Sequence, residues 1–376
     1  MPSAIVVGAG VFGAALADRL AGERWDVTLV DRYEPGHERA ESGGESRLMR
    51  FSHGSDAWYT RSAWRARELW RDLERDTGTE LLVESGLVWF ARRDDGWEAD
   101  SESALREEGV PVERLDLSEA EALYPTLGTG DLSYVLYEPC AGILRARDAT
   151  RALAWRARER GAKQERAAAR PDGTSVVLED GRCLEADRVV WACGAWLAGL
   201  FPEIVRLRVT QQDLFFFDAP PEWNTPPVPG FVDYDGAAYG LGSLDAYGVK
   251  VAPDVEGLTL DPDTWPRTHA PVNEQRAREY ARLRFPALAD AALKSVAVCQ
   301  YSLTDDTHFI AAPHPEHGAA VWIYGGGSGH GFKHGPALAE HMLDWLSERA
   351  GPEPRFGLGP RNPDRSLRTA GTALGD

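Results

Sequence analysis

AIVVGAGVFG, residues 4–13, is the stretch that decides the fold of this 376-residue chain. Its apolar run ends in three spaced glycines, and an alanine-rich segment, residues 14–21, follows. This order is typical of a strand, a tight turn and a helix. Gly8 permits the turn, Gly10 lets the backbone approach a pyrophosphate, and Gly13 lets the helix pack on the strand. A phosphate can then lie at the helix N-terminus.

A second apolar strand, residues 27–30, ends in an acidic residue, Asp31. Asp31 follows Gly13 by 18 residues, and an acid at this place can accept hydrogen bonds from a ribose diol. Strand, glycine turn, helix, strand and acid together predict a dinucleotide-binding unit, although the motif does not separate NAD from FAD. Residues expected beside the same nucleotide are Val11, Phe12 and Arg32.

Composition and charge narrow the choice of partners. Hydrophobic residues make up 43% of the chain, and 41 Lys and Arg against 59 Asp and Glu leave a formal charge of -18. Because this charge repels nucleic acid and anionic membrane surfaces, we expect a small-molecule substrate and neither of those partners. An anionic substrate would need a local basic pocket.

The first residues carry no basic leader and no long apolar helix, so we expect a cytoplasmic protein without a membrane span. The four cysteines lack CxxC spacing; they are Cys140, Cys183, Cys193 and Cys299. This spacing predicts no disulfide framework, and we expect no metal site.

The rest of the chain alternates between helical and strand patterns, which predicts an α/β (α+β) fold with two domains. Helical patterns cover residues 58–76, 148–160, 273–284 and 336–346, with Asp148 as a cap, and a short helix with a capping box is expected at 118–121. Strand patterns cover residues 175–178, 188–192, 214–217, 248–251 and 320–324. Because the strand at 188–192 returns to the nucleotide sheet, we expect a discontinuous Rossmann-like domain. We assign it residues 1–84, 142–212 and 316–360, assign residues 85–141 and 213–315 to a mixed or antiparallel sheet domain with helices that binds substrate, and expect an irregular tail at 361–376.

A second glycine-rich loop lies near the C-terminus. The sequence GGGSGHGFK, residues 325–333, follows the apolar strand at 320–324 and precedes the helix at 336–346. Backbone amides of such a loop can close over a dinucleotide, which would place Lys333 near the reactive end.

Four segments stand in a distinctive order: GGESRLMR at 43–50, residues 239–250, CQYSLTDDTH at 299–308 and GSGHGFK at 327–333. Together with the opening glycine motif they resemble the monomeric sarcosine oxidase and N-methyltryptophan oxidase family, over nearly the whole chain. The resemblance implies a D-amino-acid-oxidase-type fold with FAD in the nucleotide-binding domain. It also implies a covalent bond from FAD to a cysteine, which corresponds to Cys299 here.

The same resemblance implies an FAD-dependent oxidase of a small secondary amine or an amino or imino acid, acting as a monomer. Hydride from the C–N carbon would pass to the flavin and the electrons then to O2, giving an imine and hydrogen peroxide. Two alternatives stay open. One is a biosynthetic oxidase of a cyclic imino acid with the same flavin chemistry, and the other is a flavin dehydrogenase or FAD-binding scaffold that uses an acceptor other than oxygen.

Carried over by position, the resemblance assigns four catalytic residues. Arg50 and Lys333 correspond to the pair that holds the substrate carboxylate, and they would supply the basic pocket. Lys250 corresponds to the lysine that activates oxygen, and Arg47 to a cationic neighbour of the flavin. The substrate pocket is expected to be lined by His53 and Tyr239 as well as Arg50 and Lys333. The expected FAD contacts are Gly8, Gly10, Val11, Phe12, Gly13, Asp31, Arg32, Gly43, Ser46, Arg47, Gly194, Trp196, Cys299, Gly327, Gly329, His330, Gly331, Phe332 and Lys333.

Two departures from the family pattern concern the substrate pocket. In the arginine motif, GGESRLMR at 43–50, the acid is Glu45. The sarcosine enzymes carry a histidine two residues before this acid, and Gly43 stands at that place here. Leu241 and Gly242 differ from the bulkier residues of the family's Tyr-Gly segment. We therefore expect a pocket shaped for another substrate.

Overall fold

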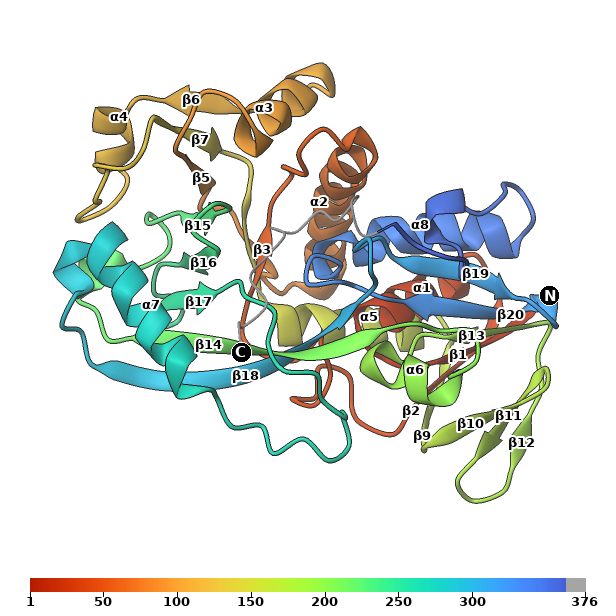
Figure 1. Cartoon of the computed structure of the whole chain (residues 1–376). Coiled ribbons are helices and arrows are strands. Elements are labelled where there is room, and N and C mark those ends of the chain that lie inside the picture. The colour runs from red at the N-terminus through yellow and green to blue at the C-terminus, as the bar shows by residue number, and fades with distance from the viewer. Residues whose placement is uncertain (363–376) are drawn as a thin grey trace.

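The computed structural model of the chain describes residues 1–362, and its first layer is a six-stranded sheet (Figure 1). The strand order is β19-β20-β13-β1-β2-β9, and all neighbours are parallel except β19 with β20. The bounds are β1 (Ser3–Val7), β2 (Asp26–Asp31), β9 (Lys163–Arg166), β13 (Arg188–Trp191), β19 (Ile310–His314) and β20 (Gly318–Gly325). Distant parts of the chain supply these strands, so the sheet is discontinuous in sequence.

The side chains of β1 alternate between two buried faces of this sheet. Ala4 and Val6 pack in one hydrophobic cluster with the helices α1 (Val11–Gly22), α2 (Ala57–Thr77), α5 (Ala146–Glu159) and α8 (Gly335–Leu346). Ile5 and Val7 pack in another cluster with α6 (Leu197–Leu200) and the small sheet of β10 (Ala169–Asp172), β11 (Ser175–Leu178) and β12 (Cys183–Leu184). Burial on both faces explains why β1 reads as a continuous apolar run. Within residues 1–362, no helix is both long enough and apolar enough to span a membrane.

A second, eight-stranded sheet lies beside the first, in the order β18-β14-β17-β16-β15-β5-β7-β6. Its neighbours are antiparallel except β15 with β5. The bounds are β5 (Leu87–Ala91), β6 (Glu113–Leu115), β7 (Tyr134–Glu138), β14 (Arg208–Phe217), β15 (Gly230–Asp233), β16 (Ala238–Leu241), β17 (Val249–Pro253) and β18 (Leu293–Leu303). Figure 1 shows α7 (Pro271–Arg284) crossing this sheet over β14 and β17. A parallel sheet next to a mixed one confirms the expected α/β (α+β) class.

Short elements connect the two sheets. The sheet β3-β8-β4 is built from β3 (Arg47–Met49), β8 (Gly142–Leu144) and β4 (Leu82–Val83). β3 contacts the short helix η4 (Phe332–His334), which brings the arginine motif next to the C-terminal glycine loop. The remaining helices are α3 (Trp97–Glu107), α4 (Leu117–Glu121), η1 (Gly194–Trp196), η2 (Pro221–Trp223), η3 (Pro286–Leu288) and η5 (Pro354–Phe356).

Two helix starts differ from the expectation. The capping box of α4 uses Asp116, not Ser118: the Asp116 carboxylate accepts from the Glu119 amide and the Glu119 carboxylate accepts from the Asp116 amide, both at 2.9 Å. α5 begins at Ala146, so Asp148 lies in its first turn and is not its cap. An acid there still stabilises the helix, since it faces the positive end of the helix dipole.

Two strands lie differently from the expected segment boundaries. β14 begins at Arg208 and runs across the boundary placed at residue 212. β19 pairs with β20 in the six-stranded sheet, although residues 213–315 were assigned to the other domain. Of the expected tail at 361–376, only residues 361 and 362 lie within the described part of the chain.

Gly13 lets α1 lie directly on the turn after β1. A Cβ atom at this position would lie 1.8 Å from the carbonyl oxygen of Gly8. Neither atom could move away without a shift of the backbone that carries it. Gly13→Ala should therefore lower the free energy of unfolding in urea by about 1–3 kcal/mol. The matched control is Gly22→Ala, whose Cβ would meet only the Arg160 side chain at 3.2 Å, and its stability should match wild type. Equal stability of the two variants would contradict the close approach at Gly13.

Candidate functional site

The first glycine turn and Asp31 lie together at the C-terminal ends of β1 and β2. Gly8 has a φ of +109°, and a Cβ there would lie 2.3 Å from the carbonyl oxygen of Ala192. The Asp31 carboxylate accepts from the backbone amides of Ala9, at 2.6 Å, and Tyr33, at 2.8 Å. Burial raises the pKa of Asp31, while these two amides act to lower it. The backbone thus fixes the acid at the place where a nucleotide-binding sheet contacts a ribose.

A cavity of about 440 Å³ opens beside this turn, at the N-terminus of α1. The expected cofactor residues that line it are Gly8, Gly10, Val11, Phe12, Asp31, Arg32, Arg47, Gly194, Trp196, Gly327, Gly329, Gly331 and Phe332. Both glycine-rich loops therefore face one cavity. The expected contacts that are not among its lining residues are Gly13, Gly43, Ser46, Cys299, His330 and Lys333.

Three residues that sequence reasoning missed also line this cavity: Glu41, Ser42 and Tyr324. The Ser42 hydroxyl accepts from the Val11 amide at 2.8 Å, and the Tyr324 ring stacks on Phe12 with centroids 4.9 Å apart. Burial raises the pKa of Glu41, against hydrogen bonds from Ser302 and the charge of Arg47. Glu41 and Ser42 directly precede the motif at 43–50. This adjacency is the sequence signal that could have indicated that they line the cavity.

Arg47, Lys250 and Cys299 come from three distant motifs and meet between the two sheets. The Lys250 ammonium, only 2% exposed, donates to Glu45 Oε1 at 3.0 Å. Arg47 Nη2 lies 3.5 Å from Cys299 Sγ on β18. The Tyr239 ring centroid is 6.0 Å from Lys250 Nζ. The expected oxygen-activating lysine and the expected flavin-linking cysteine thus share one neighbourhood.

The Lys250–Glu45 pair is a buried ion pair, with side chains 3% and 10% exposed. Burial alone would raise the pKa of Glu45, but the Lys250 ammonium and the Ser46 hydroxyl outweigh it and lower the pKa to about 2. Burial also lowers the pKa of Lys250, and the Glu45 carboxylate opposes that shift. Glu45, the acid of the arginine motif to which the sequence assigned no role, is therefore the partner that favours the charged form of a buried lysine.

Lys333 is a second buried lysine, and it lies near Arg50. Its ammonium, in a side chain 2% exposed overall, donates to the carbonyl oxygen of His330 at 2.8 Å, and within residues 1–362 no carboxylate forms a salt bridge with it. Burial, followed by the charge of Arg50, lowers the pKa of Lys333 well below its ordinary value. The two cations expected to hold a carboxylate are therefore brought together. A buried cation with so little compensation is costly, and an anionic ligand would stabilise it.

Glu138 positions the segment that carries Arg50. This fully buried carboxylate accepts from the Phe51 amide at 2.6 Å, the Ser52 hydroxyl at 2.5 Å and the Trp89 indole at 2.7 Å. The Arg50 guanidinium lies over the Trp89 ring, 5.2 Å from its centroid. No motif in the sequence pointed to Glu138, because its partners lie on other elements.

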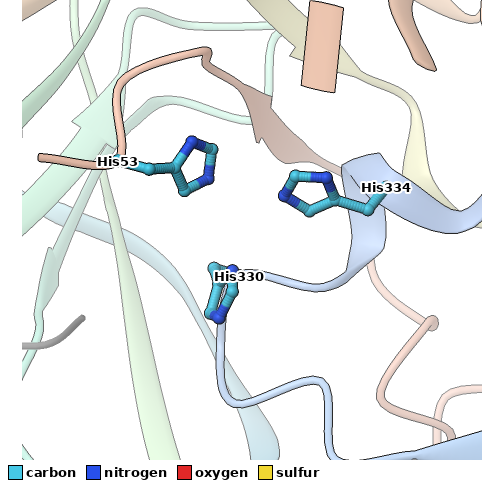
Figure 2. A group of neighbouring side chains, drawn as sticks. All are labelled: His53, His330 and His334. Atoms are coloured by element: carbon cyan, nitrogen blue, oxygen red, sulfur yellow. The ribbon is translucent and has the colours of Figure 1, made fainter. Parts of the chain in front are cut away.

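Two expected site residues, His53 and His330, meet a third histidine, His334 (Figure 2). All three rings are buried, and the ring centroid of His53 lies 6.0 Å from that of His330 and 5.2 Å from that of His334. Burial, followed by the charge of Lys333, lowers the pKa of each well below its ordinary value, so the rings are neutral. His334 was missed, although it directly follows Lys333.

A parallel sheet with two glycine loops around one cavity, joined to a mixed sheet with buried cations, defines a dinucleotide-binding protein with a cationic pocket. Comparison with protein families makes this class specific. The family described as FAD dependent oxidoreductase matches residues 3–345, and the chain belongs to it.

Individual relatives agree with the motifs. The chain is 31% identical over 352 residues to monomeric sarcosine oxidase of Bacillus sp. strain B-0618, covering 89% of this chain and 90% of that protein. It is 26% identical to N-methyl-L-tryptophan oxidase of Salmonella arizonae, over 95% of this chain and 96% of that protein. The crystal structure of L-proline dehydrogenase from P. horikoshii has the same fold, with a TM-score of 0.78 at 18% identity over 95% of this chain and 96% of that one. The family expected from the motifs is thereby confirmed.

The Lys250–Glu45 pair gives a prediction for acid stability. Glu45 has a folded pKa of about 2 against an ordinary 4.5, so its stabilisation is present above pH 4.5 and is lost as the pH falls towards 2. Glu45→Gln should lower the free energy of unfolding by about 3–5 kcal/mol at pH 7, because it strands a buried ammonium. In urea titrations, the difference in the free energy of unfolding between Glu45→Gln and wild type should become smaller as the pH falls from 4.5 to 3.

The control is Glu34→Gln, which removes a half-exposed carboxylate 3.8 Å from Arg151. It should change stability by less than about 1 kcal/mol at either pH. A Glu45→Gln deficit of the same size at pH 3 and pH 7 would show that charge pairing is not its cause.

Proposed function

We propose that the chain is an FAD-dependent oxidase of a small secondary amine or amino acid that carries a carboxylate, releasing an imine and hydrogen peroxide. The observation that carries the proposal is that buried Lys333 lies near half-buried Arg50 and directly follows Phe332, which lines the cavity of the two glycine loops. The named relatives, a sarcosine oxidase and an N-methyl-L-tryptophan oxidase, act on amines of this kind.

The cavity residues suit FAD. Gly8 and Gly13 leave no room for a side chain between the turn and its neighbours, and no side chain of the N-cap residue Gly10 closes the N-terminus of α1. A pyrophosphate can therefore lie at that helix end, with the ribose on Asp31. When bound, FAD supplies the capacity to accept two electrons and a hydrogen from a C–H bond next to nitrogen.

The protein's own groups would bind and orient the substrate. Arg50 and Lys333 would hold its carboxylate through charge-assisted hydrogen bonds, which fixes the direction in which the amine points. Their positive charge also favours an unprotonated amine beside them, since it repels an ammonium. A cyclic imino acid has the same carboxylate and nitrogen, so it stays a candidate substrate.

Lys250 would act on oxygen. Negative charge develops on O2 as electrons reach it, and a buried ammonium fixed by Glu45 is placed to stabilise that charge without rearrangement. We also propose that the enzyme acts as a monomer, as the name of its Bacillus relative suggests, and that it acts in the cytoplasm.

A peroxide-coupled screen tests this function. Purified holoprotein would be offered N-methyl, cyclic, D- and L-amino acids, with the matching decarboxylated amines as controls. We expect peroxide from at least one carboxylated secondary amine and much less from its decarboxylated form. Reduction of the flavin without peroxide would instead indicate a dehydrogenase, and no reduction by any of these amines would exclude the substrate class.

Cys299 is proposed to carry FAD through a thioether. Its thiol on β18 lies beside Arg47, which lines the cavity. After acid precipitation, wild-type protein should keep yellow, fluorescent material that runs with the polypeptide, and Cys299→Ser should release all of its flavin. Cys193→Ser is the matched control, since Cys193 itself lines the cavity and its thiol donates to the Val7 carbonyl. Complete release from wild type, or retention by Cys299→Ser, would refute the link.

Arg50 and Lys333, the proposed carboxylate clamp, give a prediction for the affinity of a carboxylate ligand. A charge-assisted hydrogen bond contributes roughly 1.5–3 kcal/mol, so Arg50→Gln or Lys333→Gln should weaken a carboxylate inhibitor by about 10- to 100-fold, read from the flavin spectrum. Because the pKa of Lys333 is lowered, wild-type affinity should fall as the pH rises and Lys333 loses its proton. Lys294→Gln, on the surface, is the control and should bind as wild type does. Unchanged affinity in both clamp variants would contradict the proposal that the substrate is an amino acid.

A further inference from the structure

Three buried imidazoles converge on one point beside the proposed substrate pocket. They belong to His53, in the loop after β3, and to His330 and His334, at the two ends of the turn that enters α8. One ring nitrogen from each residue lies within 4.8 Å of the other two, and Figure 2 shows the rings arranged around a common space. A cluster of this kind was not expected from the sequence.

In two of the rings, a contact with a backbone carbonyl determines which nitrogen carries the proton. The other nitrogen of each ring then holds the lone pair. His53 Nδ1 lies 2.9 Å from the carbonyl oxygen of Phe51, and His330 Nε2 lies 2.9 Å from that of Thr307. A carbonyl only accepts, so each of these nitrogens carries the proton of a neutral ring. The remaining nitrogens, Nε2 of His53 and Nδ1 of His330, therefore hold lone pairs. His334 Nδ1 lies 3.0 Å from the Ser62 hydroxyl, which can donate or accept. When Nδ1 donates to this hydroxyl, Nε2 of His334 also holds a lone pair.

The three inward nitrogens lack a partner among the described residues. Leaving several buried acceptors unsatisfied costs free energy, because each has lost its hydrogen bonds to water. A single species placed between them and able to accept three lone pairs would satisfy all of them at once. The outer nitrogens already have the contacts that orient metal-binding histidines in proteins, a backbone carbonyl or a hydroxyl.

We propose that His53, His330 and His334 form a three-histidine site for a divalent transition-metal ion. Neutral imidazole suits Zn2+, Co2+, Ni2+ and Cu2+, whereas Mg2+ and Ca2+ need oxygen ligands that the cluster does not offer. Three protein ligands leave a fourth position open. Because the charges of Arg50 and Lys333 act on the same rings, the fourth ligand is an anion, such as hydroxide or a small carboxylate.

Zinc binding by the holoprotein tests the site without any turnover, so its outcome is separate from that of the oxidase proposal. Calorimetric titration with Zn2+ should give one tight site, which acetate strengthens. Zinc-edge X-ray absorption of the 1:1 complex should show three imidazole nitrogens at about 2.0–2.1 Å. Absence of a tight site, or a zinc environment without three imidazoles, would overturn the proposal.

Variants assign the ligands. His334→Phe and His53→Phe should each weaken zinc binding by more than the roughly 10- to 100-fold that loss of an outer-shell partner causes. The control is the double variant His314→Ala/His317→Ala, which removes a stacked pair of rings that is not part of the cluster and should leave the tight site intact. Flavin content and melting temperature show whether each variant has folded. Tight zinc binding by folded His334→Phe and His53→Phe, or its loss in the control, would assign the metal elsewhere.

Discussion

The constraint on which this structure depends is the burial of positive charge between two sheets. Lys250 and Lys333 are buried, and Arg47 and Arg50 beside them are half-buried. Burying a charge is costly unless it is paired. Glu45 pairs with Lys250, whereas the acceptor of Lys333 within residues 1–362 is a carbonyl oxygen. The large apolar clusters on both faces of the six-stranded sheet supply the stability that such an arrangement requires. These side chains form the proposed anion pocket of a strongly acidic chain.

Topology explains how distant motifs reach this junction. β3 contacts η4, so the arginine motif near residue 47 meets the glycine loop near residue 330. β14 and β18 pair along nearly their whole length and carry Cys299 towards the nucleotide cavity, while β17 places Lys250 on the adjoining strand. Glu138, at the end of β7, then fixes the turn that follows Arg50. The residues expected to contact the nucleotide and the substrate therefore come from elements that lie far apart in the sequence.

The sequence predicted the parts of the site that local chemistry dictates. The turn at Gly8, the acid at Asp31 and the loop at Gly327 follow from backbone geometry, and the structure places all three at one cavity. Glu45, Glu138 and His334 could not be predicted, because each acquires its role from partners that are distant in the sequence. The start of α5 was wrong for a related reason: Asp148 has the residue type of a cap, but packing begins the helix earlier.

The central claim is that a buried ammonium at position 250 serves the reaction with oxygen and not the oxidation of the amine. Its most direct test is stopped-flow measurement of the two half-reactions in Lys250→Met, with exposed Lys294→Met as the control and Lys250→Met/Glu45→Gln to remove the stranded carboxylate. We predict that amine-driven flavin reduction changes only a few-fold, while reoxidation by O2 slows by at least about a hundredfold, or about 2.7 kcal/mol at 1.36 kcal/mol per tenfold. Equal slowing of both half-reactions, or reoxidation at the wild-type rate, would contradict this role.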